Sequence, residues 1–175
     1  HPVYHIYMRP ACQKPNARPA HQRPPQSSSR RFVPVTQSIH RKVIVPLIAD
    51  RNFDICTSID HKASDTGVLV AIGDVSAGLL IYVETGKACV FYNGFGEISQ
   101  LVGPTVETGR QRVNFEYEAL GKRRGRGRVT IGSDTSDWCD MSPSLLYGFH
   151  EGMDIGLDRR GPVSWELKEK YGAFR

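Results

Sequence analysis

The stretch LLIYVETGKACVFYN, residues 79–93, holds two runs of apolar and β-branched residues separated by Thr85 and Gly86. Runs of this composition favour β-strands. A two-residue connection that ends in glycine is typical of a β-hairpin, because glycine accepts a positive φ. With this loop, Glu84 faces Lys87 as a cross-strand pair of opposite charge. The stretch therefore predicts an antiparallel hairpin.

The register of this hairpin sorts its side chains into two apolar faces. One face is richer in β-branched residues, and we expect it in the core: Leu79, Ile81, Val83, Val90 and Tyr92. The other face has no evident cover in the sequence and consists of Leu80, Tyr82, Cys89 and Phe91. Because an uncovered apolar face marks an interface, these four residues are the candidate domain interface.

Further strands are predicted on both sides of the hairpin. Residues 52–60 and 110–120 alternate with period two, and the glycine-bounded apolar run 67–73 suggests a strand covered on both faces. A short strand is predicted at 128–132, another near 147–155, and one helical turn in WELKEKY, residues 165–171. Regularly spaced strands with turn signals between them predict a mainly β fold. We expect an antiparallel β-sandwich of the jelly-roll or concanavalin-like type.

The N-terminal part of the chain differs in composition from the rest. The chain has 23 Lys and Arg against 18 Asp and Glu, and eight of these bases lie in residues 1–42, which contain no acid. Prolines and polar residues dominate 9–31, and such a segment buries too little apolar surface to offset its ordering entropy. We predict a basic, Pro-rich arm over residues 1–50, poorly ordered or loosely packed, and a sandwich domain over 51–175.

A second basic cluster follows the strand at 110–120. It comprises Lys122, Arg123, Arg124, Arg126 and Arg128, interrupted by two glycines. Its place between two strands favours a solvated loop, partly neutralised by Glu116 and Glu118. No aromatic residue lies between the arginines, so the sequence offers no stacking platform for single strands. No specific nucleic-acid partner is expected.

The residues that usually carry chemistry are scattered. Cys12, Cys56, Cys89 and Cys139 form no C-x-x-C pair, and no catalytic His arrangement is evident among His5, His21, His40, His61 and His150. Loop carboxylates could bind calcium, but turn formation is the favoured role of Asp134, Asp137, Asp140, Asp154 and Asp158. Trp165 could stack on a sugar, although an anchor for the terminal loop is favoured. No catalytic residue, metal or cofactor is therefore assigned.

Several blocks resemble one known family in the same order. They are GVLVAIGDVSAGLLIYVETGKACVFYN, then NGFGE, GRQRVNFEYEALGKRRGRGRV and MDIGLDRRGPVSWEL. Together, over about residues 51–175, they resemble the C-terminal β-domain of bacterial arylsulfatases of the sulfatase family. The chain departs from that pattern at Thr85, where Asp is more common, and over residues 1–50. The family usually continues into a final strand, so we expect the sandwich to lack its last strand.

The resemblance implies an accessory domain rather than a catalytic one. Sulfatases use a cysteine in C-x-P-S-R, oxidised to formylglycine, and a divalent metal held by aspartates and an asparagine. None of the four cysteines here has that context. The expected function is therefore a non-catalytic C-terminal part of a sulfuric ester hydrolase, with an upstream sulfatase catalytic domain as partner. The alternative is a free-standing lectin-like module that binds carbohydrate or another ligand.

Two sequence features bear on location. The chain has no apolar run of about 18 residues, so no membrane partner is expected. Neither a secretory signal nor a disulfide framework is visible, which favours a cytoplasmic location.

Overall fold

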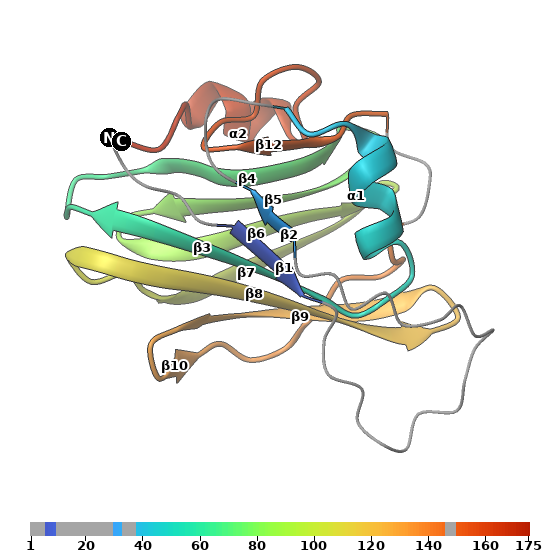
Figure 1. The fold of residues 1–175 in the computed structure, drawn as a ribbon, viewed down its shortest axis with the longest axis horizontal. Helices are drawn as coiled ribbons and strands as arrows, with labels where there is room; N and C mark the ends of the chain where they lie inside the picture. The colour runs from blue at the N-terminus through green and yellow to red at the C-terminus, as the bar shows by residue number, and fades with distance from the viewer. Residues whose placement is uncertain (1–5, 10–29, 33–37, 146–149) are drawn as a thin grey trace.

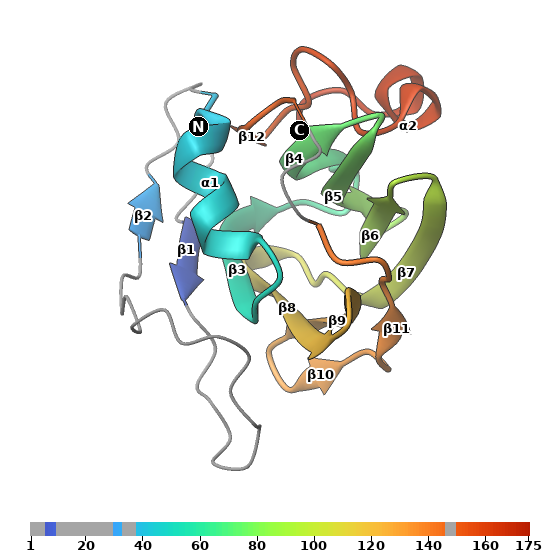
Figure 2. The same cartoon turned by 90° about the vertical axis from the view of Figure 1, so that its right-hand side faces the viewer.

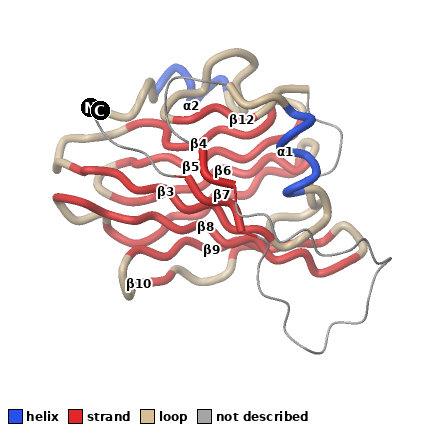
Figure 3. The backbone as a smooth tube through the Cα atoms, viewed as in Figure 1, coloured by secondary structure: helices blue, strands red, loops and turns tan. Residues whose placement is uncertain are grey.

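A computed structural model describes residues 6–9, 30–32, 38–145 and 150–175. The described part is an antiparallel β-sandwich of two sheets, with one helix at its end and a second over one sheet (Figure 1). The mainly β, antiparallel sandwich expected from the sequence is therefore confirmed. Strand dominates the trace when the backbone is coloured by secondary structure (Figure 3).

The first sheet contains the hairpin around Thr85. Its strand order is β12-β4-β5-β6-β7. The strands span β4 (Gly67–Asp74), β5 (Ala77–Glu84), β6 (Lys87–Gly94), β7 (Glu97–Thr105) and β12 (Met153–Ile155). Glu84 pairs with Lys87 and Leu79 with Tyr92, as the two-residue turn predicts. Thr85 and Gly86 both have positive φ, 48° and 71°, which is the geometry of a type I′ turn.

The second sheet has the order β10-β9-β8-β3-β1-β2, with β11 also paired to β9. Its longer strands are β3 (Phe53–His61), β8 (Gly109–Gly121) and β9 (Arg124–Ile131). Its short strands are β1 (Ile6–Arg9), β2 (Arg30–Phe32), β10 (Asp134–Thr135) and β11 (Cys139–Asp140). Residues 133–144 thus contribute two short strands at this edge of the sheet.

The core lies between the two sheets. Side chains of alternating residues meet there, and the largest fully buried ones include Tyr92, Phe115, Ile55, Leu69 and Leu79. All five side chains assigned to the core face of the hairpin belong to this cluster: Leu79, Ile81, Val83, Val90 and Tyr92. Alternation with a β-branched majority therefore identified the inner face correctly.

The predicted boundary at residue 50 is wrong. Helix α1 (Arg41–Ile48) packs on the core, and its Ile44, Val45 and Ile48 are buried. Strand β1 pairs with β3, and β2 pairs with β1. The sandwich therefore recruits parts of the predicted arm as a helix and two strands, while residues 1–5, 10–29 and 33–37 lie outside the described residues.

Helix α2 (Trp165–Lys170) covers the outer face of the first sheet (Figure 1). Ser164 caps its N-terminus by accepting a hydrogen bond from the amide of Leu167 at 3.3 Å. A short helix was predicted in this segment, and it is confirmed. Neither helix of the described chain has the length and apolar character needed to cross a bilayer.

Candidate functional site

The four candidate interface residues are not exposed. Leu80, Tyr82, Cys89 and Phe91 are between 1% and 8% exposed, beneath Val163, Leu167 and Tyr171 of the C-terminal segment. The expectation that this chain leaves the face uncovered is therefore wrong. The cover comes from a segment more than 70 residues away, whose apolar residues are too few and too irregular to reveal an amphipathic pattern.

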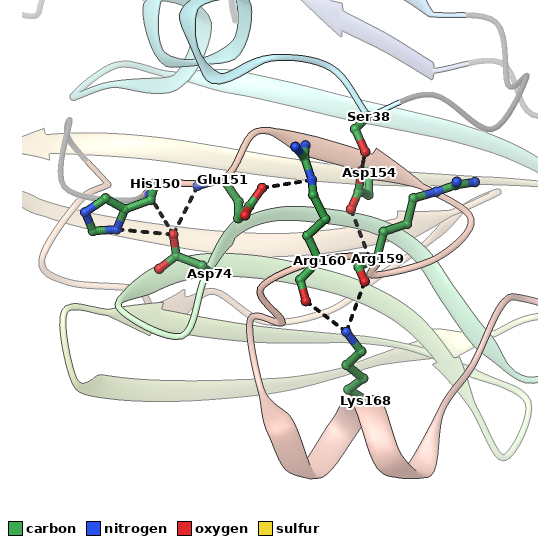
Figure 4. Close-up of polar contacts among 8 residues, drawn as sticks. All are labelled: Ser38, Asp74, His150, Glu151, Asp154, Arg159, Arg160 and Lys168. Carbon is green, nitrogen blue, oxygen red and sulfur yellow. Dashed lines mark hydrogen bonds and ion pairs between the residues drawn. The ribbon is translucent and has the colours of Figure 1, made fainter.

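The C-terminal segment is held in place by buried aspartates (Figure 4). Asp74 accepts the amides of His150 and Glu151 at 2.6 and 3.1 Å, and Asp154 accepts the amide of Arg159 at 3.0 Å and the hydroxyl of Ser38. The Lys168 ammonium donates to the carbonyls of residues 159 and 160. These contacts tie the segment to β4, β12 and α2.

The aspartates considered for calcium have other roles in the described structure. Asp158 is buried, and its carboxylate accepts the amide of Val163 at 2.9 Å. Burial raises the pKa of Asp158, and the hydrogen bond from Val163 only partly opposes this. Asp134, Asp137 and Asp140 are exposed. Within the described residues, no group of three or more His, Cys, Asp and Glu side chains is arranged to hold a metal ion.

The described cysteines sit in structural positions. Cys56 and Cys89 are buried in strands, and Cys139 is half-buried in β11. Burial raises the pKa of the Cys89 thiol to about 11 and also raises the pKa of Cys139. Because the thiolate is the nucleophile, these two thiols are poorly reactive at neutral pH. Cys12 lies outside the described residues.

The described histidines are spread over three separate places. His40 caps α1 by accepting the amide of Lys42 at 3.1 Å, and His61 is buried beside the carbonyl of Glu107 at 3.3 Å. His150 is exposed at 79% and borders Asp74. His5 and His21 lie outside the described residues. No two of these three rings meet.

The basic stretch 122–128 is mostly strand. Only Lys122 and Arg123 form the turn, with φ values of 53° and 61°, and β9 begins at Arg124. The interpretation of residues 122–128 as a solvated loop is therefore wrong beyond Arg123. The alternation of arginine and glycine in RGRGR has a structural reason, because the two residue types face opposite sides of the sheet.

The glycines of this stretch face the core. A Cβ at Gly125 would lie 1.8 Å from the hydroxyl oxygen of Tyr117, and a Cβ at Gly127 would lie 2.7 Å from the ring of Phe115. The aromatic rings of β8 therefore lie directly against the β9 backbone. Glycine is required there by close approach, not by turn geometry.

The arginines of this stretch face outward and are already partnered. Arg126 pairs with Glu118 at 2.6 Å and Arg128 with Glu116 at 2.5 Å, which confirms the predicted neutralisation. Each guanidinium carbon also lies 4.4 Å from the ring centroid of Trp138. Sequence inspection missed this ring because Trp138 follows Arg128 by ten residues and Arg126 by twelve, and it reaches them through the β9–β11 pairing.

One end of the sandwich carries exposed apolar and basic side chains on three neighbouring turns. We call it the turn end: the β4–β5 turn with Val75, the β6–β7 turn with Phe95, the adjoining Ile98, and the tip Leu120–Arg124 of the β8–β9 hairpin. It faces the viewer in Figure 2. Asn93 links the first two turns by donating to the carbonyl of Val75 at 2.7 Å. Arg123 links the third, with its guanidinium carbon 5.5 Å from the centre of the Phe95 ring.

Exposed apolar side chains gather at the turn end. Six large hydrophobic side chains of the described residues are exposed, and four of them are here: Val75, Phe95, Ile98 and Leu120. The other two are Val102 on β7 and Trp165 on α2. Trp165 is 59% exposed, with the Lys168 ammonium 5.8 Å from its ring centre, so its indole does not anchor the terminal loop.

The turn end is thus the candidate functional surface of the described chain. It combines exposed apolar side chains with three basic residues, Lys122, Arg123 and Arg124. No protein-family model matches the chain, and no curated protein matches it either.

Proposed function

We propose that this chain is a non-catalytic accessory domain of an arylsulfatase-like sulfuric ester hydrolase, with a jelly-roll or concanavalin-like topology. The observation that supports this proposal is how the sequence blocks that resemble the sulfatase family pack against one another. Residues of the last block, Val163 and Leu167, lie over the outer face of the first block's hairpin. The blocks that carry the resemblance therefore pack together within one β-sandwich.

The chemistry of the described side chains supports an accessory role. The buried carboxylates Asp74, Asp154 and Asp158 accept backbone amides, and the thiols of Cys89 and Cys139 have raised pKa values. A hydrolase built from these residues would have to break the contacts that hold its C-terminal segment. The reaction is therefore assigned to a separate catalytic domain in the same gene product.

The proposal is tested with the gene product and with the chain alone. The coding sequence upstream of residue 1 should encode a C-x-P-S-R motif, and the whole gene product should hydrolyse 4-nitrophenyl sulfate. Residues 1–175 alone should give no turnover above the uncatalysed rate. An upstream sequence without that motif, or turnover by residues 1–175 alone, would overturn the proposal.

A lectin-like binding module is the second candidate, and the exposed indole of Trp165 favours it. Aromatic rings that remain in water on a folded domain are common contacts for ligands. If this function holds, sugar binding measured by calorimetry should disappear in Trp165→Ala. It should persist in Val102→Ala, which removes an exposed apolar side chain elsewhere on the first sheet. Absence of binding to any sugar on a glycan array would count against this candidate.

A further inference from the structure

We propose that the turn end is the surface on which a second folded domain of the same gene product docks, through an acidic face with an apolar centre. This inference rests on the proposed function in one respect, namely that a catalytic domain is that partner. It goes beyond the proposed function because it assigns the surface and the chemistry of the contact.

The first argument is the distribution of apolar surface. Val75, Phe95, Ile98 and Leu120 are 53%, 38%, 51% and 44% exposed, and they come from three adjacent turns. Single exposed apolar residues are ordinary, but a group of them at one place marks a contact surface. The opposite end of the same sheet has Thr85, Gly86 and Lys87 at its hairpin, and none of these is a large apolar residue.

The second argument is backbone geometry. Five non-glycine residues of the described chain have a positive φ, and three of them, Phe95, Lys122 and Arg123, form the tips of turns at this end. A bulky residue such as Phe95, with a φ of 59°, carries local backbone strain. Strain of this kind persists where the surrounding structure maintains it, and it is concentrated at functional surfaces.

The third argument is that these strained turns are rigidly held. The Asn93 side chain accepts the amide of Gly96 at 2.8 Å and donates to the carbonyl of Val75. The amide of Ser144 donates to the carbonyl of Arg123 at 2.7 Å, and its hydroxyl donates to that of Arg124. The turn end is therefore pre-organised, which lowers the entropy cost of binding a rigid partner.

The fourth argument is charge. No carboxylate of the described residues lies within 4.0 Å of the charged groups of Lys122, Arg123 and Arg124. The next arginines along the same strand, Arg126 and Arg128, are both paired. Two exposed acids, Asp50 and Glu97, border this end without pairing to the three bases. Three consecutive unpaired bases beside apolar side chains complement an acidic partner surface.

A folded protein suits this surface better than a membrane or a nucleic acid. Phe95 lies under the guanidinium of Arg123, so its ring is held by a charged group instead of standing free to enter lipid. Arginine beside an aromatic ring is typical of the residues that dominate protein interfaces. Phosphate binding needs no apolar side chains, whereas four exposed ones lie at the same end as the bases here.

The test uses a photo-crosslinking residue, p-benzoylphenylalanine, in the whole gene product. It replaces Phe95 in one variant and Thr85 in the matched control, which is also an exposed turn residue with positive φ, at the opposite end of the sheet. We expect position 95 to crosslink to a peptide of the upstream domain that is rich in Asp and Glu. Position 85 should give no crosslink to that domain.

Charge reversal supplies a second readout. Arg123→Glu with Arg124→Glu should lower the crosslink yield from position 95 by about fivefold or more, because like charges then face each other. Arg110→Glu, at the other end of β8, should leave the yield unchanged. Equal yields from positions 85 and 95, no crosslink from position 95, or insensitivity to charge reversal would each overturn the docking proposal.

Further outcomes separate this inference from its alternatives and from the proposed function. Binding of residues 1–175 to phosphatidylserine vesicles or to duplex DNA, lost on Phe95→Ser, would overturn it in favour of that ligand. A gene that encodes no second folded domain would overturn it as well. An upstream domain without the C-x-P-S-R motif would refute only the sulfatase assignment, and the crosslinks would still decide the docking surface.

Discussion

At the scale of single residues, the glycines of β9 determine how closely the aromatic side chains of β8 can approach the β9 backbone. Gly127 leaves the space that the Phe115 ring and the Met141 sulfur occupy, with a hypothetical Cβ at 2.7 and 2.5 Å from them. Phe115 is fully buried and is one of the largest side chains of the core. A methyl group at position 127 would therefore displace core atoms.

We expect Gly127→Ala to lower the free energy of unfolding by about 2–3 kcal/mol, as overpacking of a filled core does. Gly172→Ala is the control, because a Cβ at Gly172 meets nothing within 4 Å. The control should change stability by less than about 0.5 kcal/mol. Urea unfolding followed by circular dichroism measures both changes, and equal midpoints for the two variants would contradict the expectation.

The buried thiol of Cys89 should make the free energy of unfolding depend on pH. The unfolded thiol ionises near its ordinary pKa of 9.0, whereas burial raises the pKa in the folded chain to about 11. Between these values the unfolded state binds fewer protons, so the free energy of unfolding falls as pH rises from 9 to 11. The loss is on the order of 2 kcal/mol.

Cys89→Ala should remove that part of the alkaline decline, which thermal unfolding from pH 8 to pH 11 measures. Tyr82, whose pKa burial also raises, should leave a remaining decline. Val90→Ala is the packing control, since it lowers stability at every pH without changing the slope. A slope that is identical in the parent chain and in Cys89→Ala would show that Cys89 does not contribute.

At the scale of elements, the β8–β9 hairpin has two parts with different roles. Arg126 and Arg128 are bound to Glu118 and Glu116 and lie against Trp138, so they fasten β9 to its neighbours. Arg124 lies on the same strand without an ion pair among the described residues. The three arginines should therefore differ in their effect on stability, although they look equivalent in the sequence.

We expect Arg126→Gln with Arg128→Gln to cost about 1–2 kcal/mol, from two partly exposed ion pairs and their ring contacts. Arg124→Gln should cost less than about 0.5 kcal/mol. Guanidinium chloride is an ionic denaturant and would screen the two ion pairs, so unfolding should be measured in urea. Equal losses for the double variant and for Arg124→Gln would mean that neither the ion pairs nor the contacts with Trp138 contribute to stability.

At the scale of the whole molecule, the sandwich depends on segments at both ends of the described chain. Helix α1 buries Ile44 and Ile48 against the core, and Ile39 pairs with Met153 of β12 through an isolated bridge. At the other end, the amide of Thr66 donates to the carbonyl of Arg175 at 2.9 Å. The domain therefore begins before residue 51.

Truncation tests this domain boundary. A chain of residues 51–175 loses Ile44, Val45 and Ile48, and burial of each such side chain stabilises by about 1.5–3 kcal/mol. We expect it to lack a cooperative thermal transition, whereas residues 38–175 should retain one. The comparison is by calorimetry. If residues 51–175 melt as cooperatively and at the same temperature as 38–175, α1 is not an integral part of the fold.

The sequence by itself determined the local β-architecture. The two-residue turn at Thr85 and Gly86 set the hairpin register, and alternation placed Leu79, Ile81 and Val90 on one face. Both signals depend only on neighbouring residues and on the pleat of a strand, so they are readable without the fold. A short helical turn was also predicted from WELKEKY, residues 165–171, where the structure has α2.

Only the tertiary structure decided what covers each face and which charges remain unpaired. Leu80 and Phe91 are buried because α2 folds back over them, and Arg126 lies against the ring of Trp138, which arrives from another segment. The grouping of Val75, Phe95 and Arg123 at one end likewise joins three separate turns. These contacts join residues far apart in the chain, and no local pattern encodes them, because burial depends on which segments meet in space.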